Sequence, residues 1–143
     1  MSKFELNKRL ANDCVLLGEM NVSLLLLNKN AMVPWFILVP KTTEIELTDL
    51  PVSEQHSVLE EINLVSKFVK GFFHVSKLNV AAIGNVVSQL HIHVIGRDPL
   101  DYCWPDVVWG RSESKAYSDN ELSEIIDKLK AELGDKLNSY SGH

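Results

Sequence analysis

The feature of this sequence that most constrains its fold is a run of apolar residues at helical spacing near the middle of the chain. Val58, Ile62, Val65, Val69 and Phe72 recur at intervals of four, three, four and three residues. This spacing predicts one face of an amphipathic helix of about five turns. The charged residues expected on its other faces are Glu54, Glu60, Glu61, Lys67 and Lys70. Such a helix has to bury its apolar face against another layer of structure.

Short apolar runs before and after this helix predict the strands of that layer. Residues 22–27 (VSLLLL) and 35–39 (WFILV) flank a polar turn, which is typical of a buried antiparallel pair, and residues 14–17 predict a further strand. After the helix, residues 78–83 and 89–97 follow each other across a glycine-containing break. We therefore expect these last two strands to be antiparallel neighbours.

The C-terminal part predicts a loop and a last helix. Residues 98–117 contain two prolines and two tryptophans without a clear period, which predicts a loop with buried apolar side chains. Its Trp104 and Trp109 could close over a ligand or pack in a subunit interface. Ser118 and Glu121 form a capping box that starts a helix over residues 118–137. The predicted fold is α+β: an antiparallel sheet of about five strands, one long central helix and a C-terminal helix, in a single domain over residues 1–143.

Composition and charge argue against several classes of protein. The chain has 143 residues, 45% of them hydrophobic, which is the balance of one ordinary globular domain. Its net charge of −5 and its lack of a basic block argue against binding of nucleic acid. Without a signal-like or membrane-spanning apolar segment, we expect a cytoplasmic protein with no membrane partner. Cys14 and Cys103 lack a CxxC spacing and are expected to be free thiols.

Two of the five histidines lie in the strand predicted over residues 89–97. Because side chains alternate across a strand, Gln89, His91 and His93 share one face, and the apolar residues between them belong to the core. An amide and two imidazoles are costly to bury without hydrogen-bond partners. This face is either an exposed polar surface, a pair of metal ligands or a catalytic site, since imidazole titrates near neutral pH.

A metal site would need a third protein ligand beside His91 and His93. His56, His74 and His143 lie on a helix flank, at a helix end and at the terminus, and no carboxylate has a recognisable ligand spacing. We therefore expect no metal and no other cofactor. A metal-dependent hydrolase that uses His91 and His93 remains the least favoured alternative.

The stretch GNVVSQLHIHVI, residues 84–95, resembles the signature of the histidine triad (HIT) superfamily, in which three histidines alternate with hydrophobic residues. Residues 27–41, LNKNAMVPWFILVPK, are similar to the family's strand-turn-strand, which ends in Pro-Lys or Pro-Arg. The order of the strands, the long helix and the histidine strand also agrees over residues 14–97. The resemblance implies a HIT-like fold, generally homodimeric, and a bacterial-type member with Gln89 in place of the first histidine.

The resemblance implies a nucleotide phosphohydrolase or nucleotidyltransferase that cleaves a phosphoanhydride or phosphoramidate bond of a small nucleotide conjugate. The family's middle histidine, here His91, attacks the α-phosphorus and forms a covalent intermediate, which divides a difficult step into two easier ones. His93 at the third position would donate a hydrogen bond to the phosphate oxygens. Gln89 could donate from its amide, but it cannot act as an acid near neutral pH.

The resemblance also indicates substrate-binding residues. Asn28 falls where family members place an Asp or Asn that binds the ribose hydroxyls, although the same residue type caps turns. Gly84 and Asn85 fall where the family has a glycine and a glutamine close to the phosphates. Arg97 resembles a basic residue often found after the motif, with a solvated charge at a strand end as the alternative. Trp35 replaces a histidine of many relatives and is either a core or a base-stacking aromatic.

Three positions depart from the family's pattern and keep a second function open. Gln89 and Trp35 each replace a histidine, and Val86 replaces a hydroxyl residue. Together these departures would fit a nucleotide-binding module with little or no turnover.

Overall fold

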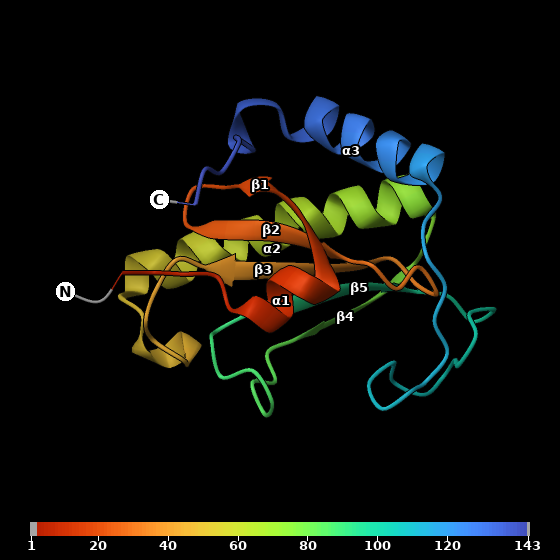
Figure 1. Ribbon diagram of the computed structural model, residues 1–143, viewed down its shortest axis with the longest axis horizontal. Helices are drawn as coiled ribbons and strands as arrows, with labels where there is room; N and C mark the ends of the chain where they lie inside the picture. The colour runs from red at the N-terminus through yellow and green to blue at the C-terminus, as the bar shows by residue number, and fades with distance from the viewer. Residues whose placement is uncertain (1–2, 143) are drawn as a thin grey trace.

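The structure, a computed structural model, describes residues 3–142 as a five-stranded antiparallel sheet with helices against it (Figure 1). In chain order the elements, with η for a short 3-10 helix, are α1 (Lys8–Asp13), β1 (Cys14–Glu19), β2 (Ser23–Asn28), β3 (Trp35–Pro40), η1 (Leu47–Asp49), α2 (Val52–Phe73), β4 (Lys77–Ala81), β5 (Ile92–Arg97), α3 (Asp119–Leu133) and η2 (Gly134–Lys136). The strand order across the sheet is β1-β2-β3-β5-β4. The predicted α+β fold is confirmed, including the antiparallel pairing of the two strands that follow the long helix.

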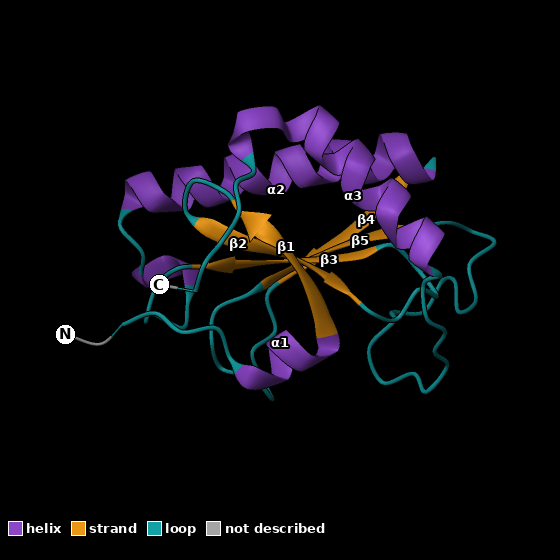
Figure 2. Ribbon diagram, turned by 45° about the horizontal axis from the view of Figure 1, so that its top comes forward, coloured by secondary structure: helices purple, strands orange, loops and turns teal. Residues whose placement is uncertain are grey.

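The long helix α2 covers one face of the sheet, and α3 lies beside it (Figure 2). An apolar core joins the sheet, α2 and α3. Its members include Leu25, Leu27, Phe36, Leu38, Ile92 and Val94 from the sheet, Val58, Val65 and Val69 from α2, and Ile125, Leu129 and Leu133 from α3. Leu90, Ile92 and Val94, which alternate with the histidines, belong to this core, as the strand pattern predicts.

Two side chains of α2 differ from the predicted helical pattern. Phe68, outside the expected stripe, is 1% exposed. Glu61 is 3% exposed, so the prediction that it lies on a face away from the apolar stripe is wrong. Its Oε2 accepts a hydrogen bond from the backbone N–H of Val22 at 2.8 Å, in the turn between β1 and β2. The buried carboxylate satisfies a backbone donor that the sheet leaves unpaired there.

Helix α2 approaches the sheet closely at Gly96 of β5. A Cβ atom at this position would lie 2.9 Å from Val69 Cγ1 and 2.9 Å from Val75 Cγ2. Carbon atoms in a packed core do not approach each other that closely without displacement. The glycine therefore lets the helix and the segment after it pack directly on the strand that carries His93.

Irregular segments, rather than long helices, cover the other face of the sheet (Figure 2). The N-terminal segment with α1 and the loop over residues 98–117 form there a second apolar cluster with the sheet. Its buried members are Leu10, Cys14, Leu24, Leu26, Val33, Trp35, Ile37, Val39, Ile95, Cys103 and Val108. The sequence pattern does not predict α1, because a helix of 6 residues is too short to show a period.

The boundaries of two other elements differ from the prediction. The capping box at Ser118 and Glu121 is confirmed, but the α-helix ends at Leu133, and η2 continues the chain toward Leu137. Strand β5 begins at Ile92 rather than at Gln89. Within residues 3–142, no helix combines the length and the apolar character needed to cross a membrane.

Candidate active site

The two central histidines lie in a cleft on the face of the sheet opposite α2. The cleft has a volume of about 290 Å³ and is lined by residues of α1, the sheet, the segment before β5 and the following loop. Five of the residues predicted from the sequence line it: His91, His93, Asn28, Gly84 and Asn85. The structure therefore brings these five together and leaves Gln89 and Arg97 outside the cleft.

A larger cavity of about 690 Å³ lies between α2 and the C-terminal segment. The side chains that line it include carboxylates, lysines and amides, and no imidazole or thiol among the residues described. The cleft that contains His91 and His93 is therefore the candidate active site.

His91 is held in the tautomer that a nucleophile needs. Its Nδ1 lies 2.7 Å from the backbone carbonyl oxygen of Gln89, an atom that can only accept a hydrogen bond. Nδ1 therefore carries the proton, and Nε2 has the free lone pair. Because the ring lines the cleft, Nε2 is the nitrogen available to attack a bound ligand.

His93 is held in the opposite tautomer by Trp35. The indole Nε1–H of Trp35 donates to His93 Nδ1 at 2.9 Å, so the proton of His93 is on Nε2. Burial lowers the pKa of His93 to about 4, and the charge of His91 acts in the same direction. At neutral pH His93 is therefore an uncharged ring with one N–H to donate.

Aromatic rings pack edge to face around His93. The centroid of the His93 ring lies 4.9 Å from that of His91, 5.8 Å from that of Trp35 and 5.2 Å from that of Trp109. Trp109 belongs to the loop over residues 98–117, so this loop lines the cleft directly. Trp104 of the same loop instead stacks over the guanidinium of Arg97. The other predicted role of this loop, packing in a subunit interface, stays a prediction.

Gln89 contacts the N-terminal segment instead of lining the cleft. Its Oε1 accepts the backbone N–H of Asn7 at 2.9 Å, and its Nε2 donates to the carbonyl of Glu5 at 2.8 Å. Because Gln89 precedes β5, the regular strand alternation does not extend to it. The amide that we expected as a phosphate donor is engaged by the protein backbone.

Asn28, Gly84 and Asn85 border the cleft from two turns. The Oδ1 of Asn28 accepts the N–H of Asn30 at 2.9 Å, which is the turn-capping alternative, and the same side chain also lines the cleft. Gly84 has a φ of 69°, a left-handed conformation that suits glycine. It turns the chain after β4 so that the exposed Asn85 lies at the cleft wall.

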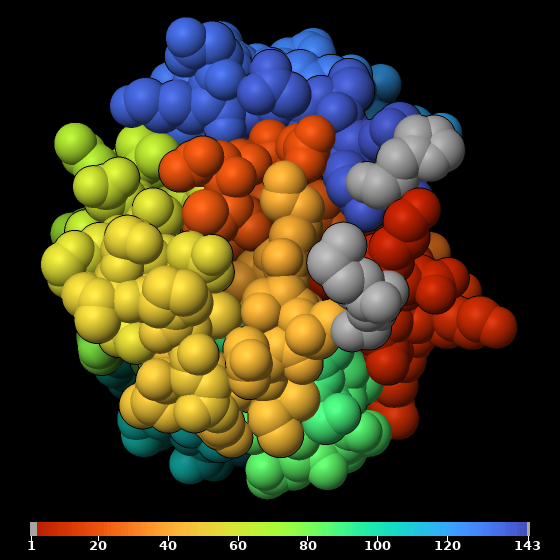
Figure 3. All heavy atoms as spheres, turned by 90° about the vertical axis from the view of Figure 1, so that its left-hand side faces the viewer, coloured from red at the N-terminus to blue at the C-terminus, as the bar shows by residue number. Residues whose placement is uncertain are grey.

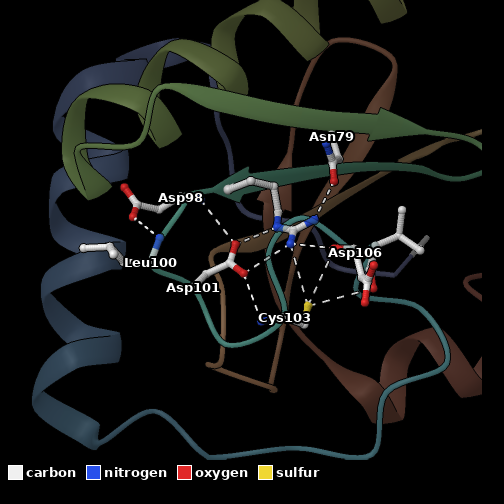
Figure 4. Close-up of polar contacts among 8 residues, drawn as sticks. Asn79, Asp98, Leu100, Asp101, Cys103 and Asp106 are labelled. Carbon is white, nitrogen blue, oxygen red and sulfur yellow. Dashed lines mark hydrogen bonds and ion pairs between the residues drawn. The ribbon is translucent and has the colours of Figure 1, made fainter.

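Arg97 is buried at the other end of β5 and anchors the following loop. The residue is 1% exposed, so the prediction of a solvated charge is wrong. Its guanidinium donates to both carboxylate oxygens of Asp101, at 2.8 and 3.2 Å, and to Asn79 Oδ1 and the carbonyl of Asp106, each at 2.8 Å. Figure 4 labels these three partners around the guanidinium. With these donors engaged, Arg97 holds the loop rather than a ligand.

The other thiols and imidazoles of the described chain do not add a second reactive centre to the cleft. Cys14 lines the cleft, but burial, together with the charge of Asp13, raises its pKa to about 12, so the thiol stays protonated. Within residues 3–142, no group of three His, Cys, Asp or Glu side chains is arranged to hold a metal ion. His56 lies in α2 and His74 ends it, whereas His143 lies outside the described residues.

Sequence reasoning missed two contributors to the site. Trp35 is buried, as its core interpretation predicts, but it also orients His93. In the register of β3 and β5, Trp35 pairs with Ile95, which makes it a diagonal neighbour of His93 on the same face. The alternation of side chains along both strands is the signal that could have placed Trp35 and His93 on the same face. Helix α1, which brings Arg9 and Leu10 to the cleft, gave no such signal.

Comparison with known proteins gives a family match. The model of the HIT domain family matches residues 9–100 of the chain. A comparison with curated protein sequences gives no match.

Solved structures agree with the family match. A histidine triad protein from Bradyrhizobium japonicum is 36% identical, with a TM-score of 0.88 over 92% of this chain and 98% of that one. A histidine triad protein from Marinobacter aquaeolei VT8 is 37% identical, with a TM-score of 0.88 over 94% and 99% of the two chains. Diadenosine triphosphate hydrolase of Plasmodium falciparum, solved with cyclomarin A, shares the fold at 18% identity, with a TM-score of 0.63 over 95% and 87%. The family match over most of the chain and the two similar bacterial structures show that this protein belongs to the HIT domain family.

Proposed function

We propose that this protein is a nucleotide phosphohydrolase or nucleotidyltransferase that acts at the α-phosphate of a small nucleotide conjugate through a covalent nucleotidyl-His91 intermediate. Membership of the HIT family suggests nucleotide hydrolase or transferase activity in general. The observation that carries the specific proposal is the hydrogen bond between His91 Nδ1 and the Gln89 carbonyl, because it leaves a lone pair on Nε2 in the cleft. The proposed substrate is a dinucleoside polyphosphate or a nucleoside phosphoramidate.

The reaction has two displacements at phosphorus. In the first, His91 Nε2 forms a bond to the α-phosphorus while the bond to the leaving group breaks, and the leaving group takes its electron pair. In the second, water or an acceptor attacks the phosphorus, the electrons of the P–N bond return to Nε2, and the attacking group's proton passes to solvent. The Gln89 carbonyl stabilises the positive ring of the intermediate, and His93 Nε2–H donates to a phosphate oxygen.

The site favours leaving groups of low basicity. His93, whose pKa is lowered to about 4 by burial and by the charge of His91, does not supply a proton near neutral pH, and an amide such as Gln89 cannot do so. A phosphoanhydride leaving group departs as an anion without a proton, whereas the amine of a phosphoramidate has to be protonated. We therefore expect dinucleoside polyphosphates to react faster than phosphoramidates.

The cleft has room for one nucleotide. A volume of about 290 Å³ is at the small end of ligand sites, so the leaving group would extend toward solvent. Asn28 is assigned to the ribose hydroxyls, and Gly84 and Asn85 are assigned to the phosphate. Their position along the cleft wall supports these roles. The diadenosine triphosphate hydrolase named above, which has the same fold, supports the proposal of a polyphosphate substrate.

A nucleotide-binding module with little or no turnover is the second candidate. In the proposed register of the motif, Gln89 takes the place of the first histidine. Its side chain is engaged by Glu5 and Asn7, which leaves His91 and His93 as the ring pair in the cleft. A metal-dependent hydrolase that uses these two histidines is the third candidate.

The experiment that separates these candidates follows product and adduct together. Diadenosine triphosphate and adenosine phosphoramidate are each incubated with the protein and a chelator, release of adenosine monophosphate is measured, and rapid quenching traps any nucleotidyl-protein. His91→Ala should abolish the adduct and reduce turnover by about 10⁴-fold or more while binding of the monophosphate persists. His56→Ala, an exposed histidine of α2, is the matched control and should change neither.

Three outcomes would contradict the proposal. Unchanged turnover by His91→Ala would remove His91 as the nucleophile. Binding of the monophosphate by wild type, without turnover or adduct, would support the binding module. The metal-dependent alternative would be supported if chelation abolished activity and added metal restored it. The restoring metal would have to be one that the substrate's phosphates do not require.

The proposal includes a cytoplasmic homodimer, which rests on the resemblance to the family and on the composition of the chain. Size-exclusion chromatography with light scattering should give twice the mass of one chain. A mass of one chain at micromolar concentration would contradict the dimer without affecting the assignment of His91.

A further inference from the structure

The side-chain amide of Gln89 makes a two-point contact with the backbone of the N-terminal segment. It accepts the N–H of Asn7 at 2.9 Å and donates to the carbonyl of Glu5 at 2.8 Å. These two backbone groups flank Leu6 on one edge of the chain, as the groups that pair in a sheet do. In Figure 3 the N-terminal segment, in red, borders the green segment that precedes β5 at the molecular surface. The contact therefore fixes both the position and the direction of residues 5–7.

The residue that Gln89 holds is also the one that starts α1. The Oδ1 of Asn7 accepts the N–H of Arg9 at 2.8 Å and caps the helix. Helix α1 then places Arg9 and Leu10 in the wall of the cleft that contains His91. Leu10 is 6% exposed within the second apolar cluster, whereas Arg9 is the one lysine or arginine among the described residues of the cleft wall.

A histidine at position 89 could not make the same contact. A carboxamide presents its acceptor and its donor side by side at the end of a flexible chain, whereas the two ring nitrogens of an imidazole point apart. An imidazole would therefore satisfy one of the two backbone groups at most. The residue type at this position fits a structural contact better than a chemical replacement of histidine.

We propose that Gln89 is a positioning residue that latches residues 5–7, so that α1 stays in place as a wall of the nucleotide cleft beside His91. The latch acts on ligand binding through Arg9 and Leu10, and not on the reacting phosphorus. It ties the part of the chain that the HIT domain model matches, residues 9–100, to the segment that precedes it. The effect on nucleotide affinity rests on the proposed function, whereas the effect on the N-terminal segment does not.

The structural part is tested without any substrate. Gln89→Ala and Gln89→His should each speed hydrogen exchange of residues 3–13 and tryptic cleavage after Lys8 or Arg9 by about tenfold, because two backbone partners are released. Gln55→Ala is the matched control, since Gln55 Nε2 also donates to a backbone carbonyl, that of Leu50, at 2.9 Å. It should leave the N-terminal segment unchanged. If residues 3–13 of Gln89→Ala exchange hydrogen as slowly as those of wild type, the proposed latch is overturned.

The functional part uses adenosine monophosphate as the binding probe and diadenosine triphosphate as the substrate. Both Gln89 variants keep the backbone carbonyl that bonds His91 Nδ1 and lose only the side-chain amide. They should therefore raise Kd and KM by about five- to tenfold and leave kcat at saturation within about twofold. A fall in kcat with KM unchanged in Gln89→Ala, or a rise in kcat in Gln89→His, would place Gln89 at the reacting phosphate and overturn the positioning role. If wild type turns over no substrate, the proposed function fails, while the exchange measurement still supports or overturns the latch.

Discussion

The two faces of the sheet differ in how they are covered. Helices α2 and α3 cover one face with a continuous apolar layer that follows helical and strand periods. The other face is covered by α1 and the loop over residues 98–117, which enclose His91, His93 and Arg97 together with apolar side chains. The face under α2 and α3, here called the periodic face, carries the larger apolar core. The face under α1 and the loop, here called the irregular face, positions the polar groups of the site.

The largest loss of stability is expected from a substitution in the core under α2, and this substitution should not affect the active site. Phe68 is 1% exposed and packs edge to face on Phe36. Phe68→Ala should lower the free energy of unfolding by about 4 kcal/mol in a urea titration, because it leaves a cavity in the core. Leu59→Ala, an exposed position of the same helix, is the control. A lower kcat in the folded Phe68→Ala protein would contradict the separate roles of the two faces.

On the irregular face, Arg97→Met should affect both stability and the site. It leaves the buried Asp101 without its partner, so a loss of about 3 kcal/mol in the free energy of unfolding is expected. Release of the loop should also move Trp109 away from His93. This movement should change the near-UV circular dichroism spectrum and kcat. Arg111→Met breaks a more exposed ion pair of the same loop, with Asp106, and should cost about 0.5 kcal/mol or less. Equal effects of the two variants would contradict the anchoring role of Arg97.

The pH dependence of stability should reveal the buried state of His93. Burial, and then the charge of His91, lowers its pKa to about 4 in the folded state, against about 6.5 in the unfolded chain. Between these values the unfolded state binds a proton that the folded state does not, so stability falls as pH falls from 6.5 to 4, by at most about 3 kcal/mol. His93→Gln should remove this part of the slope. Identical pH profiles for wild type and variant would show that His93 is not kept neutral by folding.

The smallest of these effects is expected from the bond between Trp35 and His93. Trp35→Phe keeps an aromatic ring in the second apolar cluster but removes the N–H that fixes the His93 tautomer. We expect kcat to fall about tenfold, about 1.4 kcal/mol in activation free energy, with stability changed less than in Phe68→Ala. Trp104→Phe, in the loop but outside the cleft, is the comparison variant. A kcat unchanged by Trp35→Phe would show that His93 does not need the indole donor.

The periodic face could be read from the sequence because its residues repeat. The spacing of Val58, Val65 and Val69 predicted α2, and alternation around His91 predicted which neighbours enter the core. The family resemblance, confirmed by the domain match over residues 9–100, added the fold of the whole sheet. Local sequence also predicted the capping box at Ser118.

The irregular face could not be read in this way because its contacts are made between distant segments. The bond from Asn7 to Gln89 joins residues that lie 82 positions apart, and no local pattern predicts that these two residues pair. Arg97 looked like a terminal charge because its partners Asn79 and Asp101 approach it only after the strand and the loop have folded. Trp35 and His93 are 58 positions apart, and only the register of β3 and β5 brings them together.

The protonated thiol of Cys14 determines which reagents can report on the cleft. With a pKa raised to about 12 by burial and by the charge of Asp13, and with 4% exposure, the sulfur has almost no thiolate at neutral pH. Alkylating agents and peroxides should therefore leave it intact, whereas acylating reagents selective for imidazole can react at the unprotonated Nε2 of His91. Protection of His91 from such labelling would report occupancy of the cleft in crude samples, with no substrate consumed.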